Sequence, residues 1–451
     1  MINRPPLSQA QKEQIYWGKL GGRSLSELAA AVGCTVHCAR KWWRVGRDKG
    51  LEGLRAARRG RGQAGILSGF DPAVAQTALV LKRAHPGWGA KRVLVELQAE
   101  PALHGLCLPG PSRLATLFKE QCPECVAARR PHRHPPQPAT TASRVHEQWQ
   151  LDSQEGIRLS NQEVATICNI RDPVGAAMIA SQAFSVGTER RWRKLTWTEA
   201  RDVLRTGFTE WQTLPDELKT DNELGLAGAS NDLFPGKLTL WLAGLGVTHR
   251  FIRPGHPTDQ PHIERNHRTL RDWAVNPQSV ADVDQLQHAL ERERHVHNHL
   301  YPSQASDCGG RPPLTAHPEL LTSRRAYQPD RELELFDMQG VYRLLAQLTF
   351  ERKLDSKARV SLGRQPYSLG QKLIRERQLK TVRARFDPNT AEWVFFTPDN
   401  KEEEITRLPP KGLDVQTLTG LDPSDVPLAQ VVQLPLPFFD LTLGVRLLLD
   451  S

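Results

Sequence analysis

The chain has 451 residues, of which 39% are hydrophobic, and its 60 Lys and Arg outnumber its 50 Asp and Glu, giving a formal net charge of +10. This length predicts several domains, and the positive charge favours a polyanionic partner. The chain has no apolar run of the ~18 residues that a membrane span needs, its N-terminus lacks the apolar core of a signal peptide, and its seven scattered cysteines are expected to be reduced in the cytoplasm.

The first predicted unit, residues 1–62, is a helix-turn-helix. Ser24 caps a first helix, Gly33 ends it, and Thr35 caps a second helix that runs to about Val45, with Val36, Ala39 and Trp43 toward the core. Four side chains at helical spacing share the outer face of that second helix: His37, Arg40, Lys41 and Arg44. Such a face suits the major groove of DNA, and it also fits the solvated face of an ordinary helical hairpin. A flexible arm that follows phosphates or a minor groove is expected from Arg58, Arg59 and Arg61.

A second helix-turn-helix, possibly with a wing, is predicted over residues 63–125. Its helices are expected at 72–84, at 91–99 and from about Pro111 onward. Arg113 and Lys119 on the third helix are its candidate DNA contacts.

The linker that follows, residues 126–145, is rich in Pro and Arg, which predicts an extended cationic segment. Zinc is an alternative interpretation of this region, because Cys122, Cys125, His132 and His134 occur close together. Their spacing matches common Cys₂His₂ sites poorly, so a metal-free linker is favoured.

From residue 146 to 276 strands and helices alternate, which predicts a mixed α/β domain. After a first strand that ends at Asp152, strands are expected at 163–170, 176–184, 218–220 and 248–252, and helices at 198–214, 238–245 and 260–274. A helical and Pro-rich connection, residues 277–330, contains a predicted helix at 283–299. Residues 331–407 carry short apolar runs between turn signals and predict a small SH3-like β-barrel. A tail with an apolar patch, residues 408–451, completes the chain.

Three acidic residues stand out by their local sequences. Asp152 ends an apolar run, Asp221 follows the short strand at 218–220, and Glu264 lies near the start of the helix at 260–274. Three such carboxylates could hold two divalent cations of the Mg²⁺ type, about 3.5–4 Å apart, over a phosphodiester. Any one of them alone is more often a cap or surface residue. The weaker rivals as metal ligands are Asp172, Asp259 and Glu223.

With these residues the chain resembles the DDE transposase/retroviral-integrase superfamily, most of all bacterial insertion-sequence transposases with an integrase core and a Mu-transposase-like domain order. The matching motifs are Trp-Gln-Leu-Asp at 149–152, Thr-Asp-Asn at 220–222, His-Ile-Glu-Arg-Asn-His-Arg-Thr-Leu at 262–270, and the Tyr301 to Pro313 segment. The resemblance implies a ribonuclease H-like core in which Asp152 and Asp221 lie on neighbouring strands and Glu264 lies on a helix.

The resemblance also implies a transposase that frees a 3′-OH at the ends of its element and joins it to target DNA. Asp152 would bridge two Mg²⁺ ions (Mn²⁺ is an alternative), Asp221 would hold one of them, and Glu264 the other. On the Glu264 helix, Arg268 and Arg271 are placed to hold phosphates, and His267 to contact DNA or to orient a carboxylate.

The chain departs from the family pattern at two points. Glu223 stands where the family usually has Gly, and Asp221 and Glu264 are farther apart than usual, which fits an inserted loop near residues 225–235. If Glu223 disturbs metal binding, the chain is a catalytically inactive or domesticated DNA-binding regulator. A nuclease that cuts without joining is a further alternative, because cutting and joining use the same metal ions.

The partners expected from the resemblance are double-stranded DNA, both element ends and target, and further copies of this chain assembled on that DNA. The apolar patch at 432–449 is expected to bind an ATPase target-selection protein or a neighbouring subunit, or else to pack on the chain's own barrel. No membrane association is expected, and the protein is expected in the cytoplasm, on the nucleoid when bound to DNA.

Overall fold

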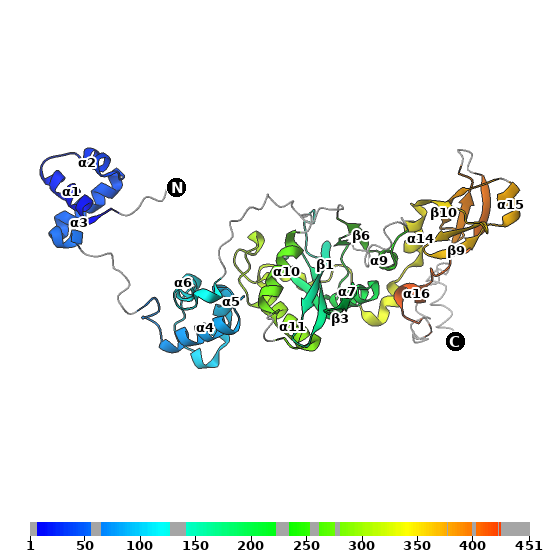
Figure 1. Ribbon diagram of the computed structural model, residues 1–451, viewed down its shortest axis with the longest axis horizontal. Helices are drawn as coiled ribbons and strands as arrows, with labels where there is room; N and C mark the ends of the chain where they lie inside the picture. Colours follow the sequence, from blue (N-terminus) through cyan, green and yellow to red (C-terminus); the bar gives the residue numbers. More distant parts are fainter. Residues whose placement is uncertain are drawn as a thin grey trace, which may run out of the picture.

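The computed structural model describes residues 7–55, 65–126, 141–221, 234–252, 261–275, 280–376, 378–398, 403–422 and 424. Figure 1 shows two helical units, a central sheet with its helices, and a C-terminal part following one another along the long axis. Within the described ranges, no helix is both long enough and apolar enough to span a bilayer.

The first helical unit consists of α1 (Gln9–Leu20), α2 (Leu25–Val32) and α3 (Val36–Arg55). Ser24 caps α2 in a capping box with Glu27, and Gly33 ends the helix with a φ of 72°. The predicted helix pair is present, whereas α1 was missed because it carries few apolar residues. Two further details of the prediction are wrong: Val36 is 40% exposed rather than turned to the core, and α3 runs ten residues past Val45, with a non-helical residue at Gly50.

The second helical unit consists of α4 (Pro72–Ala84), α5 (Ala90–Ala99) and α6 (Pro111–Gln121), at the predicted positions. The core between them is formed by Val74, Ala78, Val93, Leu114 and Leu117. The assignment of both helical units as DNA-binding modules, and the domain boundaries themselves, stay predictions.

The central domain is a six-stranded mixed sheet with the order β4-β3-β2-β1-β5-β6. Its strands are β1 (Gln148–Arg158), β2 (Glu163–Arg171), β3 (Met178–Thr188), β4 (Arg191–Trp192), β5 (Glu217–Thr220) and β6 (Thr248–Phe251). β1 to β4 pair antiparallel, whereas β5 and β6 run parallel to β1. Four antiparallel strands, of which β4 is very short, followed by two strands parallel to β1 form a ribonuclease H-like sheet, as the motifs implied.

Helices cover both faces of this sheet. On one face, α7 (Trp197–Trp211) and α9 (Lys237–Gly244) pack on a core that includes Trp149 and Leu151. On the other face, α10 (Pro261–Trp273) and α11 (Val283–His299) pack on a smaller core that includes Ile167 and Met178. Because side chains alternate along a strand, the even-numbered residues 150 and 152 of β1 face α10.

The second helical unit is joined to the central domain by buried polar contacts. Arg92 of α5 forms a bidentate ion pair with Glu293 of α11, with Nε–Oε2 and Nη2–Oε1 distances of 2.8 and 3.0 Å. Trp88 donates its indole N–H to the carbonyl of Trp273 at the end of α10, at 3.2 Å. The contacts fix α4–α6 beside α10 and α11, the helices that border the predicted active site.

The C-terminal part begins with helices and not with strands, which corrects the all-β prediction for residues 331–407. Its helices are α12 (Pro313–Ala316), α13 (Glu332–Leu335), α14 (Met338–Ala346) and α15 (Gln371–Glu376). Its strands are β7 (Thr349–Lys353), β8 (Arg359–Leu362), β9 (Gln365–Ser368), β10 (Thr381–Asp387), β11 (Glu392–Phe396) and β12 (Glu404–Leu408). They form a four-stranded sheet, β12-β11-β10-β7, and a separate β8-β9 hairpin. Closure into a barrel therefore stays a prediction.

A short helix beyond the predicted barrel, α16 (Val415–Thr419), is held against the central domain. Arg201 and Arg205 of α7 both donate to the carbonyl of Thr419, at 2.8 and 2.5 Å. Arg205 also forms a bidentate ion pair with the buried Glu332. Residues 408–422 are thus not a free tail, and the apolar patch at 432–449 lies outside the described residues. The structure also has 3₁₀ helices at Pro101–Leu103, Pro123–Cys125, Ser306–Cys308, Pro318–Leu321 and Pro329–Arg331.

Candidate active site

A polar stripe crosses β1 and β2 on the face that α10 covers. The strands pair so that Gln150 lies opposite Arg171 and Asp152 lies opposite Asn169. Gln150, Asn169 and Arg171 are all buried, at 1%, 0% and 5% exposure. Polar side chains in these positions interrupt an otherwise apolar face of the sheet. Buried polar groups are costly unless they are hydrogen-bonded, and several atoms of these side chains have no partner among the described residues, so we take this part of the α10 face as the candidate site.

Asp152 is the centre of this stripe. It lies within β1 and not at the end of the strand, as the sequence had suggested, because β1 continues to Arg158 as a hairpin with β2. Its Oδ1 accepts a hydrogen bond from the amide of Ser153 at 2.8 Å. Its Oδ2 lies 3.8 Å from Nδ1 of His267 on α10. Burial lowers the pKa of His267 to about 4, so the imidazole is neutral at pH 7.

Asp221 is aligned with Asp152 by the pairing of β1 and β5. These strands are parallel, with Gln150 opposite Lys219, so two residues further on Asp221 is level with Asp152. Asp221 follows the last residue of β5 and is half-buried. The preceding Thr220 donates its hydroxyl to the carbonyl of Asp221 at 2.9 Å. The two acids are therefore on neighbouring strands, as the family resemblance implied.

Glu264 lies in the first turn of α10, one turn before His267, and it is exposed. The structure thus brings Asp152 next to the helix that carries Glu264. No three His, Cys, Asp or Glu side chains of the described residues are grouped as a complete metal centre. The donor types still fit Mg²⁺, because all three residues offer carboxylate oxygens and none of them is fully buried.

Two asparagines beside Asp152 were missed by the sequence analysis. Asn169 and Asn266 are both fully buried, and the Oδ1 and Nδ2 atoms of each have no hydrogen-bond partner within the described part of the chain. Asn169 is opposite Asp152, and Asn266 precedes His267 on α10. The signal that could have identified Asn169 was its place in an otherwise apolar strand, two residues before Arg171 and therefore on the same face.

The rival acids have other roles or lie outside the description. Asp172 is buried, and its carboxylate accepts hydrogen bonds from the amides of His146, Val174 and Gly175 at 2.7 to 2.9 Å. It stabilises the turn after β2. Asp259 and Glu223 lie outside the described residues.

Most of the predicted DNA contacts are exposed. This holds for four residues on α3, two on α6 and two on α10: His37, Arg40, Lys41, Arg44, Arg113, Lys119, Arg268 and Arg271. His267 differs, since its side chain is 14% exposed and faces Asp152. Both roles expected for His267, DNA contact and orientation of a carboxylate, stay predictions. The predicted arm of Arg58, Arg59 and Arg61 lies outside the described residues, as do His132 and His134 of the zinc alternative.

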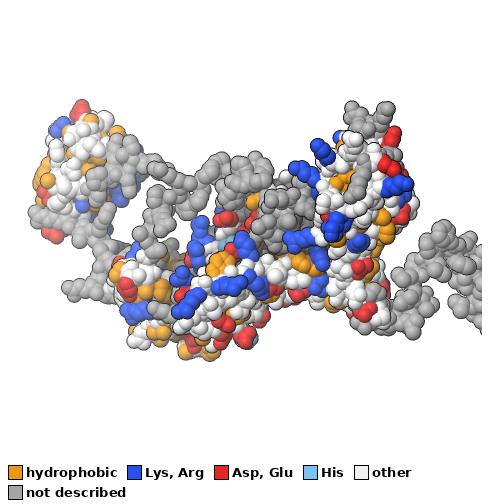
Figure 2. All heavy atoms as spheres, turned by 45° about the vertical axis from the view of Figure 1, so that its right-hand side comes forward, with side chains coloured by type: hydrophobic (Ala, Val, Ile, Leu, Met, Phe, Trp, Pro, Cys, Tyr) orange, Lys and Arg blue, Asp and Glu red, His pale blue; other side chains and the backbone are white. Residues whose placement is uncertain are grey.

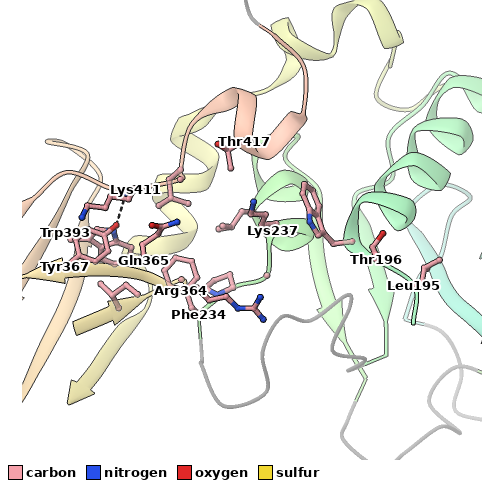
Figure 3. Close-up of a pocket in the computed structure, with 18 residues that line it drawn as sticks. Leu195, Thr196, Phe234, Lys237, Arg364, Gln365, Tyr367, Trp393, Lys411 and Thr417 are labelled. Carbon is pink, nitrogen blue, oxygen red and sulfur yellow. Dashed lines mark hydrogen bonds between the residues drawn. The ribbon is translucent and has the colours of Figure 1, made fainter. Parts of the chain in front are cut away.

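A cationic cleft of about 680 Å³ lies between α9 and the C-terminal strands, and the sequence did not indicate it. Lys237, Arg364 and Lys411 line it, and its described lining contains no Asp or Glu. Lys237 comes from one wall and the other two cations from the opposite wall (Figure 3). Figure 2 shows Lys and Arg side chains gathered over the middle of the molecule and along the near side of the C-terminal part. This distribution suits an extended polyanion.

Residues 245–313 match the family model of the integrase core domain. The matched segment contains Glu264, the rest of α10, and the Tyr301 to Pro313 ending. Among solved structures, the chain is similar to the catalytic core domain of BIV integrase, with 17% identity, a TM-score of 0.28, and coverage of 39% of this chain and 95% of that one. A further match is the HTLV-2 integrase catalytic core in complex with magnesium, with 12% identity, a TM-score of 0.28, and coverage of 38% and 96%.

A longer match is the simian T-cell lymphotropic virus intasome in complex with PP2A regulatory subunit B56 gamma. It has 15% identity and a TM-score of 0.31, and it covers 74% of this chain and 100% of that one. Similarities at this level transfer neither residue roles nor partners.

Proposed function

Because this chain is a member of the DDE transposase/integrase superfamily, we propose that it is a DNA transposase. It cuts the phosphodiester at the ends of a mobile element and joins the freed 3′-OH to target DNA. The observation that carries this proposal is the alignment of Asp152 with Asp221 on β1 and β5, next to the helix that holds Glu264. An acid on each of two adjacent strands and a third on the covering helix is the donor set that phosphoryl transfer requires.

In the proposed reaction Asp152, Asp221 and Glu264 would hold two Mg²⁺ ions. When bound, these ions lower the pKa of an attacking water and stabilise the leaving oxygen. The water breaks the bond between phosphorus and the 3′ oxygen, leaving a 3′-OH and a 5′-phosphate. That 3′-OH then attacks a target phosphodiester and displaces a target 3′-OH, so no covalent enzyme intermediate is needed.

The residues around the acids have supporting roles. His267, neutral and against Asp152, orients this carboxylate. Arg268 and Arg271 are exposed on α10 and hold flanking phosphates. The outer face of α3 and the cleft lined by Lys237 and Arg364 extend the surface for DNA. Since two ends must be joined to one target, the active form is a homo-oligomer on DNA.

Strand transfer in vitro tests this function. Purified protein is incubated with Mg²⁺, labelled DNA carrying the element ends, and a target plasmid. The variants are Asp221→Asn and Glu264→Gln, with Glu291→Gln, an exposed acid on α11, as the matched control. We expect joined products with the native protein and the control, and none with the two variants.

Any other outcome of this assay would assign the protein a different function. Bound ends that are never cut in Mg²⁺ or Mn²⁺ would indicate a DNA-binding regulator. Cut ends that are never joined would indicate a nuclease. Joined products that persist in both variants would assign the chemistry to other residues.

A further inference from the structure

A cavity of about 480 Å³ runs along α10. It lies between this helix, the end of β2 and the segment that follows α11, and Gly89 of the second helical unit also lines it. Its floor is buried and includes Arg171, Trp273 and His297. The cavity thus touches both the candidate active-site helix and a neighbouring helical unit.

Arg171 is the unusual residue of this cavity. Its side chain is 5% exposed, and its Nε has no hydrogen-bond partner within the described part of the chain. No described carboxylate lies within 4.0 Å of its guanidinium, because the adjacent Asp172 accepts from backbone amides instead. Attraction from Asp172 favours the charged form of Arg171, but a buried cation without a direct ion-pair partner is costly. Burial, followed by repulsion from Arg265, lowers the pKa of Arg171 to about 10, so the guanidinium stays charged at pH 7.

Further positive groups face the same cavity. Arg265 and Arg268 line it from α10 and are exposed cations. His262 lines it from the start of that helix and is neutral at pH 7, because burial lowers its pKa to about 4. The carboxylates that line it, Asp272 and Asp307, are exposed at the rim. Water screens those two acids, whereas Arg171 is at the dry floor, so the floor keeps an excess of positive charge.

His297 adds a second requirement. Its Nε2 lies 3.1 Å from the carbonyl of Ala176, which can only accept, so Nε2 carries the proton. Nδ1 is then a lone-pair acceptor, and it has no partner within the described residues. The rings of Trp273 and Tyr301 lie beside the imidazole, with centroids 6.2 and 6.4 Å away. A ligand that satisfies this cavity carries a negative group for Arg171 and a hydrogen-bond donor for His297.

From this combination we infer that the cavity binds one nucleotide, with its phosphate on Arg171 and Arg265 and a base or sugar donor on His297. A nucleotide has both groups, whereas inorganic phosphate fills only part of 480 Å³. Free nucleotides and DNA strands both carry the phosphate that Arg171 and Arg265 would bind. We assign an unpaired nucleotide of a DNA strand, because the cavity borders the helix that carries Glu264. This assignment rests on the proposed function.

The test compares Arg171→Met with the native protein by fluorescence anisotropy and thermal unfolding. The probes are a blunt duplex, the same duplex with one unpaired 3′ nucleotide, a deoxynucleoside monophosphate, and inorganic phosphate. Arg343→Met, an exposed arginine on α14 paired with Asp337, is the control. We expect the unpaired nucleotide to tighten native binding about tenfold, and Arg171→Met to abolish this gain while Arg343→Met retains it.

Thermal unfolding separates binding from a structural role. Arg171→Met should leave the Tm of the protein without DNA unchanged or raised, because it removes a buried charge that has no direct ion-pair partner among the described residues. A large fall in that Tm would show that Arg171 stabilises the fold, and would overturn the inference. Equal affinity of the native protein for the two duplexes would overturn the inference as well. So would a rise in Tm with the free monophosphate and none with the duplex that carries the unpaired nucleotide.

Two further comparisons complete the design. His297→Phe should reduce the preference for the unpaired nucleotide over inorganic phosphate, and an unchanged preference would contradict the role of His297. Asp221→Asn should abolish cleavage and keep the Arg171-dependent gain in binding. Loss of catalysis and loss of the nucleotide site are therefore distinguishable, and either proposal can fail without the other.

Discussion

Arg92 and Glu293 are 201 positions apart in the chain and form a fully buried ion pair between α5 and α11. Arg92 also stacks on Trp88, with its guanidinium carbon 4.1 Å from the ring centroid. The pair fixes the second helical unit to the central domain, so the spacing between a predicted DNA-binding module and the predicted active site is set by side-chain chemistry as well as by the linker.

Breaking this pair should loosen the contact between the two units. Arg92→Met leaves Glu293 buried with only Arg292 as a partner, at a cost of about 3–5 kcal/mol. Arg92→Met combined with Glu293→Leu should cost less, because no charge is left unpaired. Urea unfolding followed by tryptophan fluorescence checks both. A double variant less stable than the single one would contradict this account.

At the same contact, the backbone of Gly87 lies close to the backbone of Asp272, and this close approach gives a second prediction. A Cβ on Gly87 would lie 2.1 Å from the carbonyl oxygen of Asp272, whereas a Cβ on Gly89 would meet no atom within 4 Å. Gly87→Ala should therefore cost about 1–3 kcal/mol by overpacking, and Gly89→Ala, its matched control, much less. Limited proteolysis around residues 127–140 should accelerate only in Gly87→Ala. Equal rates in both variants would show that the contact is not maintained in solution.

Stability should depend on pH through His249. Its ring nitrogens lie 3.0 and 2.9 Å from the hydroxyls of Thr220 and Thr239, and burial lowers its pKa to about 4. Below about pH 6.5 the unfolded chain binds a proton that the folded chain does not accept until about pH 4. Stability due to this residue is complete above pH 6.5 and is lost as the pH falls, by at most about 3 kcal/mol.

His249→Asn removes this titration. Its urea midpoint should be lower at pH 7.5, where two hydrogen bonds are lost, and should fall less steeply between pH 7 and 5 than that of the native protein. Other buried histidines contribute to the slope in both proteins, so the difference between the two slopes is the quantity to measure. Parallel curves would show that folding does not lower the pKa of His249.

The exposed face of α3 predicts a salt-dependent affinity for DNA. Replacing Arg40, Lys41 and Arg44 together by Ala should weaken binding and reduce the slope of log K against log salt by about 1 for each lost phosphate contact. Anisotropy titrations at several salt concentrations measure this slope. Arg331→Ala, which removes an arginine paired with Glu334 on the C-terminal part, is the control. An unchanged slope in the triple variant would assign α3 a role other than phosphate contact.

The sequence predicted local structure well where periodicity and caps agree. The helices α4, α5, α6 and α11 and the strands β2 and β5 lie within a residue or two of the expected positions, because capping residues and apolar spacing are local signals. It failed for α1, whose apolar residues are sparse, and for α14, which was included in an all-β region. Neither error concerned the elements that carry Asp152, Asp221 and Glu264.

The candidate site was predictable only in part. Asp152 and Asp221 could be found because each adjoins an apolar strand. That the two lie on neighbouring strands was implied by the family resemblance alone, and their register is seen in the pairing of β1 with β5. The positions of Arg171 and His297 could not, because their burial beside α10 results from packing between segments distant in sequence. A buried arginine and an exposed one have the same appearance in a sequence, and only the fold shows which of them has no partner.

The attachment of Thr419 to Arg201 and Arg205 affects how any shortened form of this protein should be designed. A stop codon after Leu408 would delete α16 and leave two arginines of α7 without their shared acceptor. Its phenotype would combine a damaged central domain with the loss of the residues beyond. Ending the chain after Asp422 retains this anchor, so only that shorter deletion would report on what the last residues themselves do.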